Sequence, residues 1–255
     1  MKLKHVHAVI TGGASGLGQA AAENIVAGGG QVALFDVNEE LGEALALQLG
    51  EAATFHKVDV TSEAAVDESV NAAAEAMGGL NVAVNCAGVG WPKRMVGKEG
   101  PMPGDFFRKV IEINLVGTLL VCKAAAAAMQ SNEPNEDGER GAIVMTASVA
   151  AFDGQIGQVA YSASKGGIVG MTLPMARELA SKGIRVVTVA PGLFMTPMMA
   201  GLPAEAQESL GKQVPFPSRL GRPAEYALLV QQIIENPMLN GETIRLDGAI
   251  RMAPR

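Results

Sequence analysis

Short apolar segments alternate with longer segments of helical pattern along most of the 255-residue chain. The apolar runs have the length and composition of buried strands, whereas the segments between them carry apolar residues at helical spacing. This alternation predicts a parallel sheet joined by right-handed helical crossovers, and hence a doubly wound α/β fold with helices on both faces. The expected strands are His7–Thr11, Val32–Asp36, Thr54–Val58, Val82–Asn85, Ile143–Thr146, Arg185–Val189 and Thr243–Leu246.

Three irregular stretches interrupt the alternation. Residues 91–105 hold three prolines and three glycines, which predicts a loop before the next helix. Residues 131–141 are polar and acidic, and we expect a solvated connection there. Residues 192–217 are rich in Met and Pro and directly follow a strand. A surface excursion with a short helix would fit them, but ligands of doubly wound sheets bind beyond the carboxyl ends of strands, so we expect a substrate lid.

The composition contains no marker of a linker, so we expect one domain over residues 1–255, with a substrate loop at 89–105 and the lid at 192–217. Hydrophobic residues make up 48% of the chain and aromatic residues only 4%, and there are 31 glycines. These proportions indicate a core of Ala, Val, Ile and Leu with many tight turns, which suits parallel strands covered by helices.

The charge and the cysteines narrow the class of partner. A net charge of −6 without a basic cluster argues against nucleic acid or an anionic membrane. Cys86 and Cys122 lie in apolar segments and match neither a metal site nor a disulfide framework, so we predict no metal. We find no apolar run near the ~20 residues of a membrane span, and the first strand begins early, so we expect a cytoplasmic protein. His5, His7 and His56 are interpreted as structural.

A glycine-rich segment, TGGASGLG at residues 11–18, follows the first strand and opens a helix. Its glycines allow a tight turn and close backbone approach, and the helix N-terminus offers N–H groups to a pyrophosphate. Asp36 ends the second strand, where a carboxylate can accept hydrogen bonds from a ribose and repel a 2′-phosphate. The sequence therefore predicts NAD rather than NADP. The expected contacts in this half are Gly12, Ser15, Gly16, Leu17, Gly18, Asp36, Asp59, Val60, Asn85, Cys86, Ala87 and Gly88.

Asp59 has a second interpretation as the N-cap of the helix that follows it.

The other predicted chemical site is the pair Tyr161 and Lys165, which lie four residues apart and would share one helix face. A nearby ammonium can offset the roughly 4 kcal/mol needed to ionise a tyrosine at neutral pH. Ser148 ends the preceding strand segment and could meet the tyrosine. On its own, Tyr-x-x-x-Lys is more often an ordinary exposed helix pair.

Several motifs occur together in one order: the glycine loop, Asn85-x-Ala87-Gly88, Asn114, Ser148, Tyr161 with Lys165, and Pro191-Gly192. In this order they resemble the short-chain dehydrogenase/reductase family over essentially the whole chain. The resemblance implies a Rossmann-like sheet of about seven strands, a Ser-Tyr-Lys-Asn catalytic set and a homotetramer. Cys86 stands where many members carry a second asparagine, and we expect it to pack as a small apolar residue.

The resemblance also implies a role for each catalytic residue. Tyr161 would be the acid/base, and Lys165 would lower its pKa and hold the nicotinamide ribose. Ser148 would donate a hydrogen bond to the substrate oxygen. Asn114 would hold a water that relays the proton, or alternatively cap a helix kink. Further nicotinamide contacts are expected at Pro191, Gly192, Phe194 and Thr196, although Phe194 could equally be part of the lid core.

Segments in the second half, among them 147–152 and 246–252, resemble the type II 3-hydroxyacyl-CoA dehydrogenases within that family. This implies NAD-dependent oxidation of short or branched (S)-3-hydroxyacyl-CoA in fatty-acid metabolism. The alternatives are a dehydrogenase of hydroxysteroids or other secondary alcohols, and a non-catalytic dinucleotide-binding scaffold. Substrate contacts are expected at Ser148, Tyr161, Gln155 and Gln158, the last two with a solvated turn as alternative. An apolar acyl pocket is expected from Phe152, Leu202 and Met198 or Met199, with Trp91 as a loop anchor and 246–254 buried against a neighbouring subunit.

Overall fold

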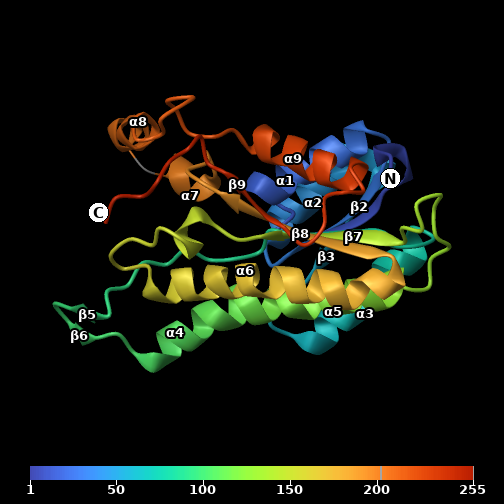
Figure 1. Ribbon diagram of the computed structural model, residues 1–255, viewed down its shortest axis with the longest axis horizontal. Coiled ribbons are helices and arrows are strands. Elements are labelled where there is room, and N and C mark those ends of the chain that lie inside the picture. Colours follow the sequence, from blue (N-terminus) through green and yellow to red (C-terminus); the bar gives the residue numbers. More distant parts are fainter. Residues whose placement is uncertain (202, 255) are drawn as a thin grey trace.

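The computed structural model describes residues 1–201 and 203–254, apart from the side chain of Met198. Seven parallel strands form one sheet in the order β3-β2-β1-β4-β7-β8-β9 (Figure 1). This order confirms the Rossmann-like α/β prediction. The strands are β1 (His7–Thr11), β2 (Gln31–Asp36), β3 (Ala53–Lys57), β4 (Val82–Asn85), β7 (Gly141–Thr146), β8 (Ile184–Pro191) and β9 (Thr243–Leu246).

Helices cover both faces of this sheet. One face holds α1 (Gly16–Ala27), α2 (Glu39–Leu49) and α9 (Pro223–Glu235), and the other holds α3 (Glu63–Ala76), α5 (Gly117–Met129) and α6 (Val159–Leu179) (Figure 1). Each face has its own apolar cluster. Because both faces are covered, the central strands are apolar throughout, and Ala8, Val9 and Ile10 of β1 are fully buried.

Local sequence sets several of the helix starts. Asn38 caps α2 by accepting a hydrogen bond from the Leu41 N–H, and Ser62 caps α3 by accepting one from Ala65. Asp59 is therefore not the N-cap of α3, contrary to its second interpretation. Its carboxylate instead accepts the Thr61 N–H at 2.9 Å, which shapes the turn between β3 and α3.

One continuous helical segment, 104–129, joins α4 (Gly104–Ile111), the π-helical turn Glu112–Val116 and α5. Its length and mean hydropathy of 1.7 meet the requirements for crossing a bilayer, and half of its most apolar window is buried inside the protein. Its Val121, Cys122 and Met129 belong to the apolar cluster beneath the sheet. A long apolar helix in the core of a protein also meets these requirements of length and composition.

The three irregular stretches have more structure than the sequence predicts. The loop at 89–105 contains a small antiparallel hairpin of β5 (Val96–Gly97) and β6 (Gly100–Pro101), and the 192–217 stretch contains two helices, α7 (Pro197–Ala200) and α8 (Ala204–Lys212). The remaining single-turn 3₁₀ helices are Leu3–His5, Gly50–Ala52, Val149–Ala151 and Ala180–Lys182.

The expectation of a fully solvated connection at 131–141 is wrong for Glu139. Only 6% of this residue is exposed, and its carboxylate accepts hydrogen bonds from Nε and Nη2 of Arg185 at 2.9 and 2.6 Å. Arg185 is the second residue of β8 and is itself buried, so its charge requires a buried partner. The acidic composition of the stretch conceals this one structural carboxylate.

Candidate active site

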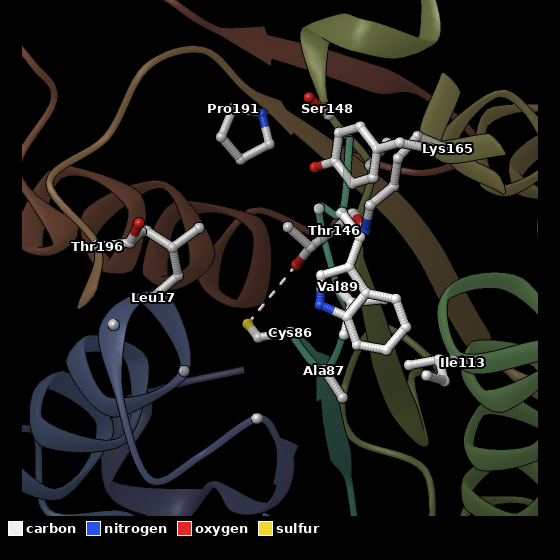
Figure 2. A pocket seen from close by; sticks show the side chains of 18 of the residues that line it. Leu17, Cys86, Ala87, Val89, Ile113, Thr146, Ser148, Lys165, Pro191 and Thr196 are labelled. Atoms are coloured by element: carbon white, nitrogen blue, oxygen red, sulfur yellow. Dashed lines mark hydrogen bonds between the residues drawn. The ribbon is translucent and has the colours of Figure 1, made fainter. Parts of the chain in front are cut away.

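One cavity of about 1020 Å³ lies at the carboxyl ends of the parallel strands. It is bordered by the loops after β1, β2, β4, β7 and β8, so residues far apart in sequence face the same space (Figure 2). Leu17 and Thr196 lie on one side of it, and Ser148 and Lys165 lie across from them (Figure 2). The position agrees with the ligand sites of doubly wound sheets.

The glycine loop forms one end of the cavity through its backbone. Gly12 and Gly16 have φ values of +60° and +56°, a conformation that side-chain-bearing residues rarely adopt. A Cβ on Gly18 would lie 2.2 Å from the Gly12 carbonyl oxygen, so only glycine allows α1 to approach the turn this closely. Ser15 is the N-cap of α1, and its hydroxyl makes no capping hydrogen bond. The loop and the start of the helix thus present backbone groups and a hydroxyl to the cavity.

Two carboxylates stand beyond this loop, at the ends of β2 and β3. Asp36 accepts the Ala14 N–H at 3.1 Å, which fixes the carboxylate against the glycine loop. Asp59 is exposed and borders the cavity beside the buried Val60. Both acids lie where the sequence predicts contacts to the adenosine part of a dinucleotide.

The segment after β4 is divided between the cavity and the core. Cys86, Ala87 and Gly88 line the cavity, whereas Asn85 is 3% exposed and donates to the Cys122 Sγ at 3.5 Å and the Val144 carbonyl at 3.4 Å. The Asn85 side chain thus lies outside the cavity lining, and a contact of this residue with the cofactor stays a prediction. Successive strand residues point to opposite faces of the sheet, and the Asn85 side chain points toward Cys122 of α5.

Cys86 faces a small polar network rather than apolar side chains alone. Its Sγ lies 3.3 Å from the Tyr226 hydroxyl and 3.6 Å from Oγ1 of Thr146 (Figure 2). Burial raises the pKa of the Cys86 thiol, and these hydrogen bonds oppose that shift. A thiol held neutral in this way fits packing better than nucleophilic chemistry.

Ser148 and Tyr161 come together as the sequence predicts. Ser148 follows β7 and caps the 3₁₀ turn Val149–Ala151, and Tyr161 lies in the first turn of α6. Burial raises the pKa of Tyr161, and the nearby Ser148 hydroxyl opposes that shift. A hydroxyl donor beside a buried phenol is the arrangement needed to bind and protonate a substrate oxygen.

Lys165 is buried one helical turn further along α6. Its Nζ donates to the Thr146 carbonyl at 2.8 Å and lies 5.8 Å from the Tyr161 ring centroid. Desolvation lowers the pKa of Lys165 to about 8. Burial is the largest cause of the raised Tyr161 pKa, Lys165 does not contribute to that shift, and its expected lowering of the tyrosine pKa stays a prediction.

Asn114 lies outside the cavity lining and supports the loop after β4. It sits in the π-helical turn with no exposed surface. Its Oδ1 accepts the Val89 N–H at 2.8 Å, and its Nδ2 donates to the Val89 carbonyl at 2.9 Å and to the Ser164 Oγ at 3.0 Å. The side chain therefore joins the π-helical turn to the loop after β4 and to α6, and the predicted role of Asn114 in holding a relay water stays a prediction.

The segment after β8 provides the wall near Tyr161. Pro191, Gly192, Phe194 and Thr196 all border the cavity. Phe194 is 7% exposed and packs closely against Gly221, with which it forms an isolated β-bridge. Both interpretations of Phe194 thus apply, because it lines the cavity and also anchors the start of the lid.

Some of the residues expected to contact the substrate border the cavity, and their contact with a substrate stays a prediction. Gln155 and Gln158 border the cavity, but their amides are engaged: Gln155 donates to the Ala253 carbonyl at 3.0 Å, and Gln158 accepts the Gln155 N–H at 2.9 Å. Met199 lines the cavity, while Phe152 does not and instead lies against Arg245, 5.3 Å from the ring centroid. Leu202 and the Met198 side chain lie outside the described residues.

Sequence reasoning missed several lining residues. Trp91 was expected only as a loop anchor; its ring does stack at 6.4 Å on Phe106, but it also borders the cavity. Ile113, Arg108, Lys109 and Glu112 also line the cavity, and no motif marks them, since each reaches the cavity only through the fold. Val89, Val149 and Met252 lie in segments that the sequence singles out, but no role in the lining was expected for these three residues.

Comparisons with known proteins agree with this geometry. A family model described as short chain dehydrogenase matches residues 6–207. The chain is 55% identical over 254 residues to 3-hydroxyacyl-CoA dehydrogenase type-2 of Homo sapiens, covering 99% of this chain and 97% of that protein. It is 36% identical to ipsdienol dehydrogenase of Ips pini, covering 95% and 96% of the two chains. The crystal structure of 3-hydroxyacyl-CoA dehydrogenase type-2 from Mycobacterium avium superposes with a TM-score of 0.95 at 42% identity, covering 99% and 98%.

Proposed function

The chain belongs to the short-chain dehydrogenase/reductase family, and from this premise we propose that it oxidises short or branched (S)-3-hydroxyacyl-CoA to 3-oxoacyl-CoA with NAD. The observation that carries the proposal is the placement of Ser148, Tyr161 and Lys165 together on the wall of a cavity that also borders the glycine loop. The substrate class is supported by the relatives named for this reaction, which match along nearly the whole chain.

The end of the cavity at the glycine loop suits a dinucleotide. Gly12 and Gly16 keep the loop free of side chains, and the start of α1 offers N–H groups to a pyrophosphate. Asp36 would accept hydrogen bonds from the adenosine ribose, and its charge would repel a 2′-phosphate, which favours NAD over NADP. When bound, the dinucleotide supplies the hydride acceptor.

The protein's own groups act on the substrate oxygen. In the oxidation, Tyr161 takes the proton of the substrate hydroxyl at its phenolic oxygen, so its ionised form is the active one. Ser148 donates a hydrogen bond to the same substrate oxygen and stabilises the charge that develops there. Because burial raises the pKa of Tyr161, the oxidation is expected to speed up as the pH rises.

Lys165 is the third residue of the proposed catalytic set and lies one helical turn beyond Tyr161. With a pKa of about 8 it can carry or release a proton near neutral pH. We propose that it binds the nicotinamide ribose and passes the proton toward the Asn114 backbone. Asn114 would contribute through its backbone position, since its side chain is fully occupied by Val89 and Ser164.

Oxidation of a hydroxysteroid or another secondary alcohol is the second candidate. The cavity wall carries the apolar residues Val149, Leu193 and Met199, and such a wall admits many apolar alcohols. The similarity to a protein named ipsdienol dehydrogenase also favours this candidate.

The test measures NADH formation by the purified chain with NAD and three substrates: (S)-3-hydroxybutyryl-CoA, 2-methyl-3-hydroxybutyryl-CoA and estradiol. Efficient turnover of either thioester supports the proposal and separates the straight from the branched chain. Turnover of estradiol alone would replace the proposal by the second candidate. Parallel rates with NADP test the cofactor, and a tenfold preference for NADP would contradict the role of Asp36.

Homotetrameric assembly, a cytoplasmic location and the lack of a nucleic-acid partner remain proposals. Light scattering of the purified chain would give the mass of the assembly. A gel shift with RNA at physiological salt would contradict the last of them.

A further inference from the structure

The C-terminal segment Asp247–Pro254, called the tail below, turns back sharply after β9. Gly248 and Ala249 have φ values of +59° and +68°, and among the described residues Ala249 is the one non-glycine residue with a positive φ. The Asp247 carboxylate accepts the Ala249 N–H at 3.0 Å and stabilises this turn. A left-handed alanine persists only where its surroundings impose the conformation, so the path of the tail is set by its contacts.

The tail contacts the end of the lid on one side. A Cβ on Gly248 would lie 2.4 Å from Cγ1 of Val214, and the Phe216 N–H donates to the Gly248 carbonyl at 3.2 Å. Ile250 is 2% exposed and packs close to Gly192. The tail is thus attached both to the lid and to the segment after β8.

On its other side the tail is bound to the turn that follows Ser148. Gln155 donates to the Ala253 carbonyl at 3.0 Å, and the Ile156 N–H donates to the Pro254 carbonyl at 3.0 Å. Arg245 links the two segments, because its Nη2 contacts the Asp153 carboxylate at 2.6 Å and its Nε contacts Asp247 at 2.7 Å. The pKa of Asp153 is lowered by this guanidinium.

These contacts bring Met252 to the cavity. It is partly buried and lines the same space as Gln155 and Met199. A methionine fills an irregular apolar gap and can adapt to a flexible chain. No other residue of the tail lines the cavity among those that the structure describes.

We infer that the tail forms one wall of the substrate end of the cavity and that Met252 determines which length of apolar chain the enzyme accepts. The Arg245–Asp153 ion pair is the positioning contact that keeps this wall in place. The inference rests on the proposed function for its choice of substrate, but it applies to any substrate with an apolar chain.

The test compares the wild type with Met252→Ala and Met252→Phe on the (S)-3-hydroxy derivatives of butyryl-, hexanoyl- and octanoyl-CoA. The ratio of kcat/KM for octanoyl to butyryl should rise roughly tenfold in the alanine variant and fall by a similar factor in the phenylalanine variant, as expected for gaining or losing space of this size in an apolar pocket. The NADH dissociation constant, measured by fluorescence, should not change. Met238→Ala, at a site 89% exposed, is the matched control and should keep the wild-type ratio.

Unchanged ratios in both Met252 variants, with active wild type, would overturn the inference and leave the proposed function intact. If the wild type turns over no acyl-CoA, the proposed function fails, and the same variants are compared on 2-butanol, 2-hexanol and 2-octanol. A change in the chain-length preference of the Met252 variants on these alcohols would still support the inference, and an unchanged preference would overturn it. Inactivity of the wild type in both series would overturn both.

Discussion

The two ends of the cavity are built in different ways. At the cofactor end, segments that follow one another closely make the surface: the backbone of the glycine loop after β1, and the carboxylates of Asp36 at the end of β2 and Asp59 after β3. At the substrate end, side chains from distant segments meet, such as Trp91, Met199 and Met252. A surface made by local backbone tolerates little change, whereas one made by converging side chains can change its shape by single substitutions.

Tyr161 and Lys165 lie between the two ends and differ from the buried charges elsewhere in the protein. Arg185 donates two hydrogen bonds to Glu139 at 2.9 and 2.6 Å, so its charge is compensated. Lys165 has a backbone carbonyl as its hydrogen-bond partner, and desolvation lowers its pKa to about 8. A buried charge without a carboxylate is typical of a functional site rather than of a stabilising one.

The largest effect on turnover is expected from a substitution at Tyr161, between the cofactor end and the substrate end of the cavity. Tyr161→Phe removes the acid/base and should lower kcat by roughly 10²- to 10⁴-fold while NADH binding persists. The wild-type oxidation rate should rise with pH as the phenol ionises, and the residual rate of the variant should not follow that rise. Stopped-flow measurements give the oxidation rates, and fluorescence titration gives the affinity for NADH.

A variant that retains most of its turnover would refute the role of Tyr161. Tyr226→Phe is the matched control, because it removes the other tyrosine hydroxyl from a core position 2.8 Å from Oγ1 of Thr146. It should lower the unfolding free energy by about 1 kcal/mol and leave kcat within a few-fold of the wild type.

Lys165→Met should abolish efficient turnover and at the same time stabilise the cofactor-free protein. A pKa shift from 10.5 to about 8 corresponds to roughly 3 kcal/mol of destabilisation at neutral pH, and methionine removes that cost. Between about pH 8 and pH 10.5 the unfolded state binds more protons at this site than the folded state, so the wild type gains stability as pH rises. The stability advantage of Lys165→Met over the wild type should therefore decrease over this range. Urea unfolding at several pH values measures this, with the exposed Lys182→Met as control. A variant less stable than the wild type at neutral pH would contradict the argument.

At the cofactor end, Asp36→Asn should change the choice of dinucleotide. It keeps an oxygen that can accept the Ala14 N–H and removes the negative charge. The loss of a charged acceptor is worth about 1.5–3 kcal/mol, so the kcat/KM ratio of NAD to NADP should fall roughly 10- to 100-fold. Glu39→Gln removes a neighbouring exposed charge and should leave the ratio unchanged. If Asp36→Asn and Glu39→Gln had the same ratio of kcat/KM for NAD to that for NADP, Asp36 would not select the cofactor.

At the substrate end, Asp153→Asn should have the smallest effect. It weakens the contact with Arg245, which joins the tail to the catalytic turn. A pair of this kind contributes about 0.5–1 kcal/mol, so the octanoyl to butyryl selectivity should change only about 2- to 5-fold with NADH affinity unchanged. The exposed Asp137→Asn is the control. A loss of NADH affinity in Asp153→Asn would show that the ion pair supports the whole site rather than the substrate wall.

Local sequence patterns were enough to predict the strands of the sheet, the glycine loop and the placing of Tyr161 and Lys165 on one helix face. Strand periodicity, the glycines and the four-residue helical spacing are local properties, and each acts within a few residues. They can be recognised without knowing which segments meet. For this reason the seven expected strands are present, and nearly all of the residues expected to contact the cofactor border the cavity.

Contacts between distant segments set the direction of the Asn85 side chain, the hydrogen bond of the Gln155 amide, the burial of Glu139 and the place of Met252. Asn85 points toward Cys122 of α5 because of the pleat of β4, and Glu139 is buried because its partner Arg185 lies in β8. Met252 reaches the cavity because the turn at Gly248 and Ala249 and the contacts of Arg245 direct the tail there. Such positions depend on contacts between residues far apart in the sequence: 46 positions for Glu139 and Arg185, and 98 for Gln155 and Ala253. The local sequence does not show which of these segments meet.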